Sequence, residues 1–311
     1  MLTRRSVLKL GGLLALQQAC SVRPQPPTEE MSSFRLFEQG KWHAVICCAV
    51  QASAQVRTAA TLLARYCQQC TGVPIAAVAK PSAEQVCIQI GAGVGEPPAS
   101  EVLRGLDADG FVIDFPDNRT VRILGVTDWG TEFGVYEFLE RYLGVRWLLP
   151  GPQGEYVPQL QTLTLMPELV RQQPVFTSRL LSGLRGEEQV TWARRQRQHG
   201  RIEFHDNLRN LFPPEQYTKT HPHFFPLRDG KRYLPPTNTS PAWQPCFSAH
   251  GLVDEAVKNI CAYFARHPNA TSYSLAVNDG HGYCECDLCT GGDEKRRNAL
   301  GLVDASRAYF A

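Results

Sequence analysis

Acidic side chains follow a short apolar segment, 272–277, that has the composition of a buried strand. Asp279 comes just after it, and Glu285 and then Asp287 lie a little further on. Hydrolysis of a glycosidic bond normally needs two carboxyl groups, one to protonate the leaving oxygen and one to act as base or nucleophile. Asp279 and Glu285 are the candidates for such a pair, with Asp287 in reserve. The structural alternative is that Asp279 caps the turn into Gly280 and that Glu285 points into water.

Polar and aromatic side chains follow a second predicted strand, 202–204, and continue through a long segment, 205–245. Aromatic rings that stack on sugars, and polar groups that bond hydroxyls, are typical of a small-ligand pocket. The alternative is a stiff loop that covers the core, although loops of this length are uncommon unless they are functional. The candidate ligand-binding side chains are His205, Asn207, His223 and Asn278.

A cysteine-rich segment, 281–289, carries three thiols and one imidazole: His281, Cys284, Cys286 and Cys289. Thiolates at this spacing, together with an imidazole, can converge on a tetrahedral ion, so the segment predicts a structural zinc site. A disulfide, for example to Cys246 or Cys261, explains the same residues equally well, and free thiols are the third alternative. The remaining C-x-x-C pair, Cys67 and Cys70, lies in a predicted helix and indicates buried thiols or one local bridge.

The first 20 residues have the three parts of a twin-arginine export signal. Arg4 and Arg5 form the charged head, and the apolar run 10–16 follows them. This run is much shorter than the roughly 20 apolar residues that span a bilayer, so a signal explains it better than a membrane helix. The alternative is a basic disordered tail. Cys20 at the exit predicts lipid attachment, so we expect a periplasmic or membrane-anchored lipoprotein.

Composition narrows the classes of partner. The formal charge is +2, and the signal contributes three positive charges through Arg4, Arg5 and Lys9, so the mature chain is close to neutral. The sequence has no basic run, which argues against nucleic acid as a partner. About 290 residues remain after the signal, and this length predicts two domains.

Alternating strand and helix patterns predict an α/β sandwich domain over 44–165, after a linker over 21–43. The expected strands are 44–50, 86–90, 110–115, 120–124 and 145–149, with a turn at 116–118 that makes the third and fourth a hairpin. The expected helices are 55–69, which stops at Gly72, and 131–142, which stops at Gly144. Trp129 and Trp147 are expected in the core.

A linker is expected at 166–174, and a second series of strands and helices follows it. We expect strands at 178–181, 202–204 and 272–277, helices at 187–199 and 252–266, and a last helix that begins near Asp293. Repeated strand and helix units with long loops after the strands are typical of a parallel barrel whose loops form the active face. Only about half of the eight units are present. The sequence therefore predicts that 175–311 is the first, truncated part of an incomplete (β/α)8 (TIM) barrel.

Two series of motifs resemble known families. The first comprises the segments 125–130, 133–140 and 143–147, with the sequences GVTDWG, FGVYEFLE and LGVRW. It is similar to the accessory domain that precedes the catalytic barrel of α-glucuronidases and β-hexosaminidases. The second comprises FHDNL at 204–208, FPPEQY at 212–217, HPHFF at 221–225, CFS at 246–248, SLAVNDG at 274–280 and CECDLC at 284–289. It resembles the domain-of-unknown-function 4838 family, large envelope proteins with a glycosidase-like barrel.

The resemblance implies an exported carbohydrate-active protein related to glycoside hydrolases, with an oligosaccharide or polysaccharide as ligand and no cofactor for hydrolysis. In the related hexosaminidases the fourth barrel strand ends in an Asp-Glu pair, and the corresponding position here is Asp279-Gly280. The alternatives are therefore a non-catalytic glycan-binding lipoprotein and a truncated, inactive fragment.

Overall fold

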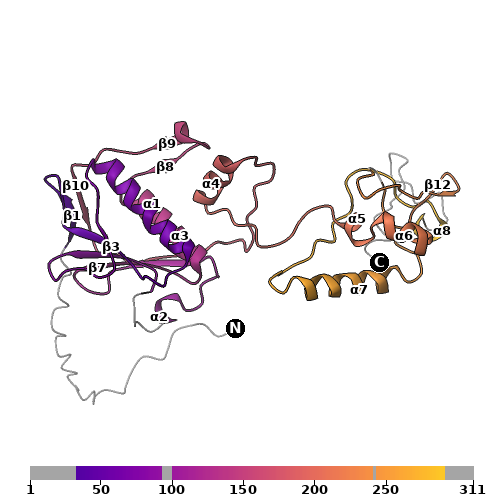
Figure 1. The fold of residues 1–311 in the computed structure, drawn as a ribbon, viewed down its shortest axis with the longest axis horizontal. Coiled ribbons are helices and arrows are strands. Elements are labelled where there is room, and N and C mark those ends of the chain that lie inside the picture. Colours follow the sequence, from indigo (N-terminus) through magenta and orange to yellow (C-terminus); the bar gives the residue numbers. More distant parts are fainter. Residues whose placement is uncertain (1–32, 93–99, 241–242, 291–311) are drawn as a thin grey trace, which may run out of the picture. The chain divides into compact units, whose positions relative to one another are not determined.

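The computed structural model describes residues 33–92, 100–240 and 243–290. The chain forms two compact units, Met1–Val145 with Val157–Gln173 and Arg146–Tyr156 with Pro174–Ala311, which we call unit 1 and unit 2 (Figure 1). The predicted export signal, Cys20 and the helix expected near Asp293 lie outside the described residues. No helix in the described ranges has the length and apolar character needed to cross a membrane.

Unit 1 is built on a six-stranded mixed sheet in the order β11-β6-β7-β5-β3-β4. The parallel strands are β3 (Ala44–Cys48), β4 (Ala77–Val78), β5 (Val86–Ile90) and β7 (Thr120–Gly125). β6 (Phe111–Asp114) pairs with β7 in antiparallel register, which confirms the predicted hairpin. β11 (Val170–Gln172) adds an antiparallel edge beside β6.

Two helices lie side by side over one face of this sheet, α1 (Ala54–Thr71) and α3 (Asp128–Arg141) (Figure 1). Ser53 caps α1 by accepting a hydrogen bond from the Val56 N–H at 3.1 Å, and Gly72 ends it in the left-handed conformation at φ 73°. The buried carboxylate of Glu132 joins the two helices, since Oε2 accepts from the side chain of Gln55 at 2.8 Å. A short helix, α2 (Ser100–Leu103), precedes β6.

The first turn of α3 approaches the hairpin so closely that glycines are required. A Cβ on Gly130 would overlap the carbonyl oxygen of Gly110, and one on Gly125 would overlap the backbone nitrogen of Thr131. Both obstacles are backbone atoms, which cannot rotate away as a side chain can. The Thr131 hydroxyl instead accepts a hydrogen bond from the Gly125 N–H at 3.1 Å. Glycine therefore sets the distance between helix and sheet.

Two segments expected as linkers form strands. β1 (Phe34–Glu38) lies in the expected linker 21–43, where it pairs with β2 (Lys41–Trp42) and with β10 (Thr162–Leu165). β11 lies in the expected linker 166–174. Phe34, Leu36 and Phe37 are buried. The strands are too short for period-two alternation to stand out, and only pairing with residues far along the chain stabilises them.

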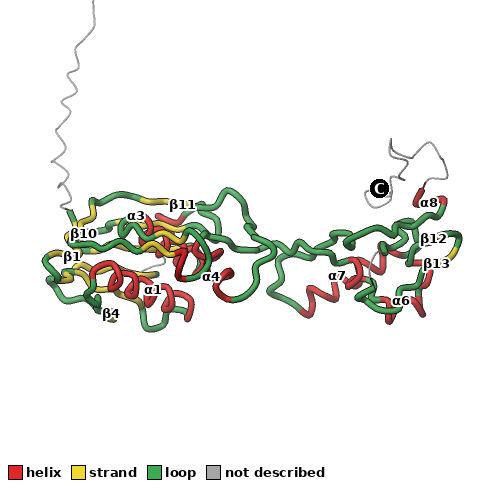
Figure 2. Tube along the Cα trace, turned by 90° about the horizontal axis from the view of Figure 1, so that it is seen from above, coloured by secondary structure: helices red, strands yellow, loops and turns green. Residues whose placement is uncertain are grey.

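Unit 2 contains more loop than regular structure (Figure 2). Its helices are α4 (Glu187–Arg195), α5 (Leu208–Leu211), α6 (Pro214–Thr220), α7 (Leu252–Arg266) and α8 (Asp287–Thr290), with 3-10 turns η1 (Pro152–Gly154) and η2 (Pro222–Phe224). The short strands are β8 (Arg146–Trp147), β9 (Glu155–Tyr156), β12 (Leu227–Arg228) and β13 (Lys231–Arg232).

The core of unit 2 is aromatic. Trp243, Phe225 and Tyr217 are almost fully buried, and apolar side chains of α7 pack against them. The segment 205–245 is thus a folded part of the core with two helices, rather than a covering loop. Trp147 is buried as expected, but it belongs to unit 2, where its carbonyl accepts from the indole N–H of Trp192 at 2.9 Å.

The structure confirms a mixed α/β protein, but the expected barrel sheet is not confirmed. The segment 178–181 contributes one antiparallel bridge, Arg179 to His199, and the segments 201–207 and 271–278 share one parallel bridge, Asp206 to Ala276. No regular strand is present in these three segments. The predicted helix 187–199 ends at Arg195, because Gln196 leaves the helical conformation and Arg197 adopts φ 58°.

Candidate glycan site

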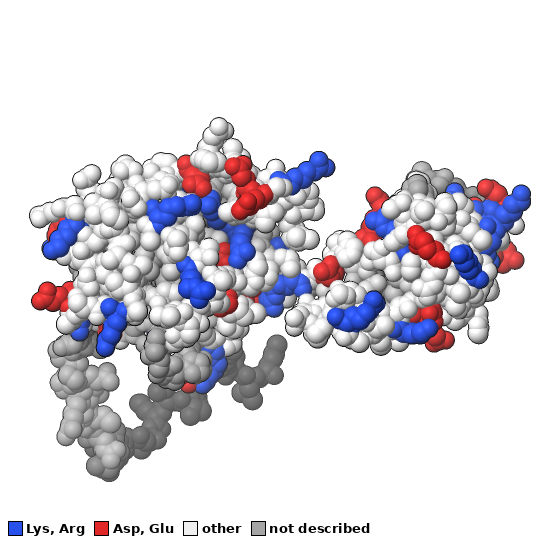
Figure 3. Space-filling model, in the orientation of Figure 1, with Lys and Arg blue, Asp and Glu red and all other residues white. Residues whose placement is uncertain are grey.

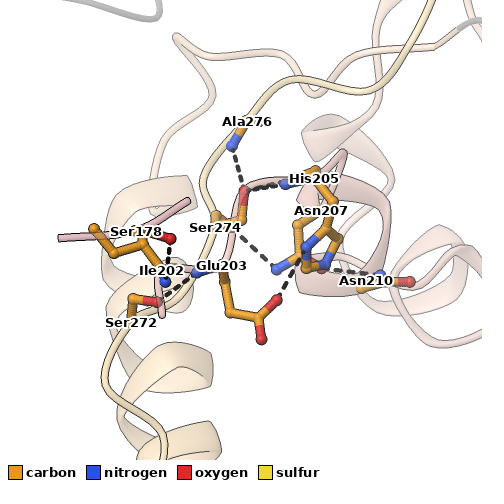
Figure 4. A network of polar contacts seen from close by, with 9 residues as sticks. All are labelled: Ser178, Ile202, Glu203, His205, Asn207, Asn210, Ser272, Ser274 and Ala276. Atoms are coloured by element: carbon orange, nitrogen blue, oxygen red, sulfur yellow. Dashed lines mark hydrogen bonds and ion pairs between the residues drawn. The ribbon is translucent and has the colours of Figure 1, made fainter. Parts of the chain in front are cut away.

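Two extended segments of unit 2, 201–207 and 271–278, lie side by side and form the base of the candidate site (Figure 4). Serine hydroxyls supply part of the ladder: Ser272 accepts from the Glu203 N–H at 2.7 Å, and Ser274 donates to the His205 carbonyl at 2.6 Å. The Asn207 N–H donates to the Ala276 carbonyl at 3.2 Å. These bonds fix the register, so Glu203, His205 and Asn207 project along one face.

An open pocket of about 490 Å³ runs along this face, and we call it the His205 pocket. Its walls come from the two segments, from α5 and α6, and from α7. The polar and aromatic side chains that line it are Glu203, His205, Asn207, Asn210, Gln216, Tyr217, Asn259, Tyr263, Arg266, Tyr273 and Ser274. Aromatic rings among amides and a few charges suit a polyhydroxylated ligand.

The ring of His205 faces a carboxylate within the pocket. Its Nδ1 lies 3.3 Å from Oε2 of Glu203, and the two side chains are 50% and 54% exposed. Asn207 is buried: its Nδ2 donates to the Ser274 carbonyl at 3.0 Å, and its Oδ1 accepts from Asn210 at 2.9 Å. His205 is therefore available to a ligand, whereas the Asn207 amide holds the two segments together.

The buried phenol of Tyr217 stiffens the wall of the His205 pocket. The Tyr217 hydroxyl donates to Glu255 at 2.7 Å and accepts from the Asn259 amide at 2.7 Å. Burial raises the pKa of Tyr217, and the hydrogen bond from Tyr217 lowers the pKa of Glu255. Burial also raises the pKa of Tyr273. Both tyrosines therefore remain neutral hydrogen-bonding groups at physiological pH.

Asp279 lies outside the lining of the His205 pocket. It is exposed, and its backbone N–H donates to Oδ2 of Asp206 at 3.1 Å. The structure thus places two carboxylate residues, Asp206 and Asp279, at the ends of the paired segments. The sequence analysis did not single out Asp206, although its position two residues after the predicted strand 202–204 was a usable signal.

Asn278 is a structural residue in this geometry. It is 5% exposed, its Oδ1 accepts from the Arg209 N–H at 2.8 Å, and its Nδ2 donates to the Trp243 carbonyl at 2.9 Å. Its backbone N–H and carbonyl both bond the side chain of Gln244, at 3.0 and 2.6 Å. Every polar group of Asn278 is therefore used within the protein.

Two further residues of the predicted site, Glu285 and His223, also lie outside the lining of the His205 pocket. Oε2 of Glu285 accepts from the Asp229 N–H at 2.8 Å, which ties the carboxylate to the turn between β12 and β13. Nε2 of His223 lies 3.2 Å from the carbonyl of His250. The structure therefore unites His205 with Asn207, and it does not bring Asp279, Glu285 or His223 into their pocket.

Four cysteines of unit 2 converge: Cys246, Cys284, Cys286 and Cys289, which we call the cysteine cluster. Their sulfur atoms all lie within 4.8 Å of one another. Cys246 was not in the predicted ligand set but lies with its three cysteines, whereas the predicted His281 is outside this group. No disulfide joins the cysteines that the structure describes, and this includes the buried Cys67 and Cys70 in α1.

Hydrogen bonds within the cysteine cluster move two thiol pKa values in opposite directions. Bonds with Cys284 and Cys289 raise the pKa of Cys246, and the bond from Cys246 lowers the pKa of Cys289 to about 3. In α1, burial raises the pKa of Cys70 to about 11, so that thiol stays protonated and unreactive.

Unit 2 contains most of the segment that a known family covers. Residues 149–303 match the family model described as "Domain of unknown function (DUF4838)". The resemblance predicted from the second motif series is confirmed. The cysteine cluster and the His205 pocket both lie within this DUF4838 segment.

Solved structures of glycoside hydrolases are similar to the chain at low identity. A GH115 4-O-methyl-α-glucuronidase with specificity for decorated arabinogalactans matches at 18% identity and TM-score 0.35, over 44% of this chain and 18% of its own. A Streptomyces coelicolor GH20 β-N-acetylhexosaminidase matches at 16% identity and TM-score 0.33, over 48% of this chain and 25% of its own. A Streptomyces plicatus β-hexosaminidase matches at 17% identity and TM-score 0.30, over 48% of this chain and 24% of its own.

The chain spans a quarter or less of the length of these three enzymes. No curated protein matches it.

Proposed function

We propose that the chain is an exported glycan-binding protein of the DUF4838 family and that the His205 pocket binds the sugar. The observation that carries this proposal is the lining of the pocket, where half-exposed His205 and Glu203 stand among tyrosines and amides. The partly exposed rings of Tyr263 and Tyr273 offer apolar faces to the C–H face of a sugar, and the amides pair with its hydroxyls. The glycosidase-like motif series supports the same ligand class.

Charged groups in the pocket narrow the sugar to acidic or amino-sugar residues. Arg266 offers a planar set of donors that suits the carboxylate of a uronic acid. Glu203 offers an acceptor that suits the N–H of an amino sugar. Lysine, arginine and acidic side chains are interspersed on the face shown in Figure 3. Among the described residues, this face therefore has no large positively charged patch of the kind that binds nucleic acid.

Export and lipid attachment at Cys20 belong to the same proposal, and the motif in the first 20 residues supports them. Neither glycan binding nor hydrolysis by carboxylates requires a cofactor. A metal ion held by the cysteine cluster would therefore have a structural role.

Titration of the purified chain with a panel of uronic-acid and amino-sugar oligosaccharides tests glycan binding. His205→Ala is expected to weaken the Kd by about tenfold, because one or two polar contacts of about 1.4 kcal/mol in total are lost. His250→Ala is the matched control, since His250 is exposed and only its backbone carbonyl makes a bond with His223. Absence of binding across the panel, or equal loss with both variants, would refute the proposal.

Hydrolysis is the second candidate function. It is favoured by the position of Asp206 and Asp279 at the ends of adjacent segments, where the Asp279 backbone N–H reaches the Asp206 carboxylate. One carboxylate would protonate the leaving oxygen, and the other would act as base or nucleophile. Each of Asp206→Asn and Asp279→Asn is expected to lower kcat by about 10²- to 10⁴-fold while the Kd changes little. Asp229→Asn, an exposed aspartate in the β12–β13 turn, is the control. If wild-type chain that binds glycan releases no sugar, the protein is a binder alone.

A further inference from the structure

The cysteine cluster joins two segments that are far apart in the sequence. Cys284, Cys286 and Cys289 lie on one short loop and on α8, whereas Cys246 follows the buried Trp243. The backbone holds Cys246 in place, because its N–H donates to the Phe224 carbonyl at 2.8 Å. Cys246, Cys284 and Cys289 are each less than 10% exposed. A group bound here would be shielded from water.

The distances between the sulfur atoms match a tetrahedron around one ion. A zinc–sulfur bond is about 2.3 Å long, so neighbouring sulfurs of a regular tetrahedral site lie about 3.8 Å apart. Sγ of Cys246 lies 3.7 Å from Sγ of Cys286 and 3.7 Å from Sγ of Cys289, and all four sulfurs are within 4.8 Å of one another. One disulfide would use two of these sulfurs and leave the other two unexplained.

Protein donors point at the same sulfurs. The Leu227 N–H donates to Sγ of Cys284 at 3.2 Å, and the Ser248 hydroxyl lies 2.9 Å from Sγ of Cys289 and 3.5 Å from Sγ of Cys286. Such outer bonds orient metal-bound thiolates and spread their negative charge. They serve no purpose for a disulfide sulfur, which carries no charge.

Backbone hydrogen bonds also fix the shape of the loop that carries Cys284, Cys286 and Cys289. The Glu285 N–H donates to the Leu227 carbonyl at 2.8 Å, and the Thr290 N–H donates to the Cys286 carbonyl at 2.9 Å. These bonds place the side chains of Cys284, Cys286 and Cys289 on a common centre, in a C-x-C-x-x-C arrangement that shares its loop with β12. Four soft sulfur ligands in tetrahedral array select zinc or iron among the metals common in proteins.

We infer that Cys246, Cys284, Cys286 and Cys289 bind one structural zinc ion as four thiolates. The ion links the loop after Gly280 to the aromatic core that carries Cys246. Asp279 lies just before this loop. His281 is not a ligand. This inference is independent of glycan binding, because the cluster and the His205 pocket share no residue.

Elemental analysis of the chain purified without added metal tests the inference. We expect about one zinc per chain, and Cys246→Ser is expected to lower zinc retention after dialysis about tenfold or more. Cys261→Ser is the matched control, since Cys261 is an exposed thiol of α7 outside the cluster. His281→Ala should also leave zinc content unchanged, and it distinguishes four thiolates from a site of three thiolates and one imidazole.

A spectroscopic readout covers the case in which Cys246→Ser does not fold. Replacement of zinc by Co²⁺ in the wild-type chain should give the visible bands and the intense thiolate charge-transfer absorption of a tetrahedral four-sulfur site, and His281→Ala should give the same spectrum. Peptide mass spectrometry should show the four cluster cysteines reacting with a thiol reagent only after chelation. Stoichiometric iron, no metal at all, disulfide-linked cluster peptides, or zinc lost in His281→Ala would each overturn the inference.

Discussion

Gly130→Ala is expected to lower the stability of unit 1 by about 3–5 kcal/mol, a large effect for one added methyl group. The added Cβ would overlap the carbonyl oxygen of Gly110, and it would also lie 3.1 Å from the Cα of Gly125. Relief requires α3 to move off β6 and β7, which opens a gap in a buried apolar layer. The urea midpoint followed by far-ultraviolet circular dichroism measures this loss.

Gly105→Ala separates the steric clash from backbone strain. Gly105 has φ 76°, and nothing lies within 4 Å of the position of its Cβ. Its replacement should therefore cost only the strain of a left-handed alanine, about 1 kcal/mol. Similar losses in the two variants would show that close approach of α3 to the hairpin is not what Gly130 provides.

Asn278→Ala is expected to destabilise unit 2 by about 2–4 kcal/mol. The substitution leaves the Arg209 N–H and the Trp243 carbonyl without their partner, in surroundings where Asn278 is 5% exposed. Each lost bond leaves a polar group that costs about 1–3 kcal/mol when it is buried. Chemical denaturation followed by tryptophan fluorescence reports the change, because Trp243 lies in the affected core.

Asn118→Ala is the matched control for Asn278→Ala, since Asn118 is an exposed residue of the turn between β6 and β7. It should change the unfolding free energy by less than about 0.5 kcal/mol. A variant at Asn278 that keeps wild-type stability but loses glycan affinity would contradict a structural role. It would return this residue to the substrate-binding role that the sequence predicted.

Local patterns determined much of the architecture. The helix expected over 252–266 is α7, with the same limits, because its apolar spacing and flanking Gly251 and His267 lie within one short stretch of chain. The β6–β7 hairpin follows equally from apolar runs on either side of a Pro-Asp-Asn turn. The motif series after Phe204 was sufficient to predict the family, which the match over 149–303 confirms.

Contacts between distant residues decided the rest. β1 and β11 have too few residues to show a strand pattern, so their existence depends on partners in β10 and β6. Sequence spacing grouped His281 with the nearby cysteines, but backbone bonds at Phe224 and Leu227 bring Cys246 into the cluster instead. Asn278 looked like a pocket residue because it follows a strand, and only the tertiary fold turns its amide inward.

The sequence by itself therefore predicted the export motif, the similarity to the DUF4838 family, the main helices and the residue types of both candidate sites. Only the tertiary structure decided which residues meet: Asn207 with Ser274, Asp206 with Asp279, and Cys246 with the C-x-C-x-x-C loop. The physical reason is that periodicity and turn chemistry act over a few neighbouring residues. Side-chain convergence depends on register and packing between segments separated by 40 residues or more, as the Cys246–Cys286 contact shows.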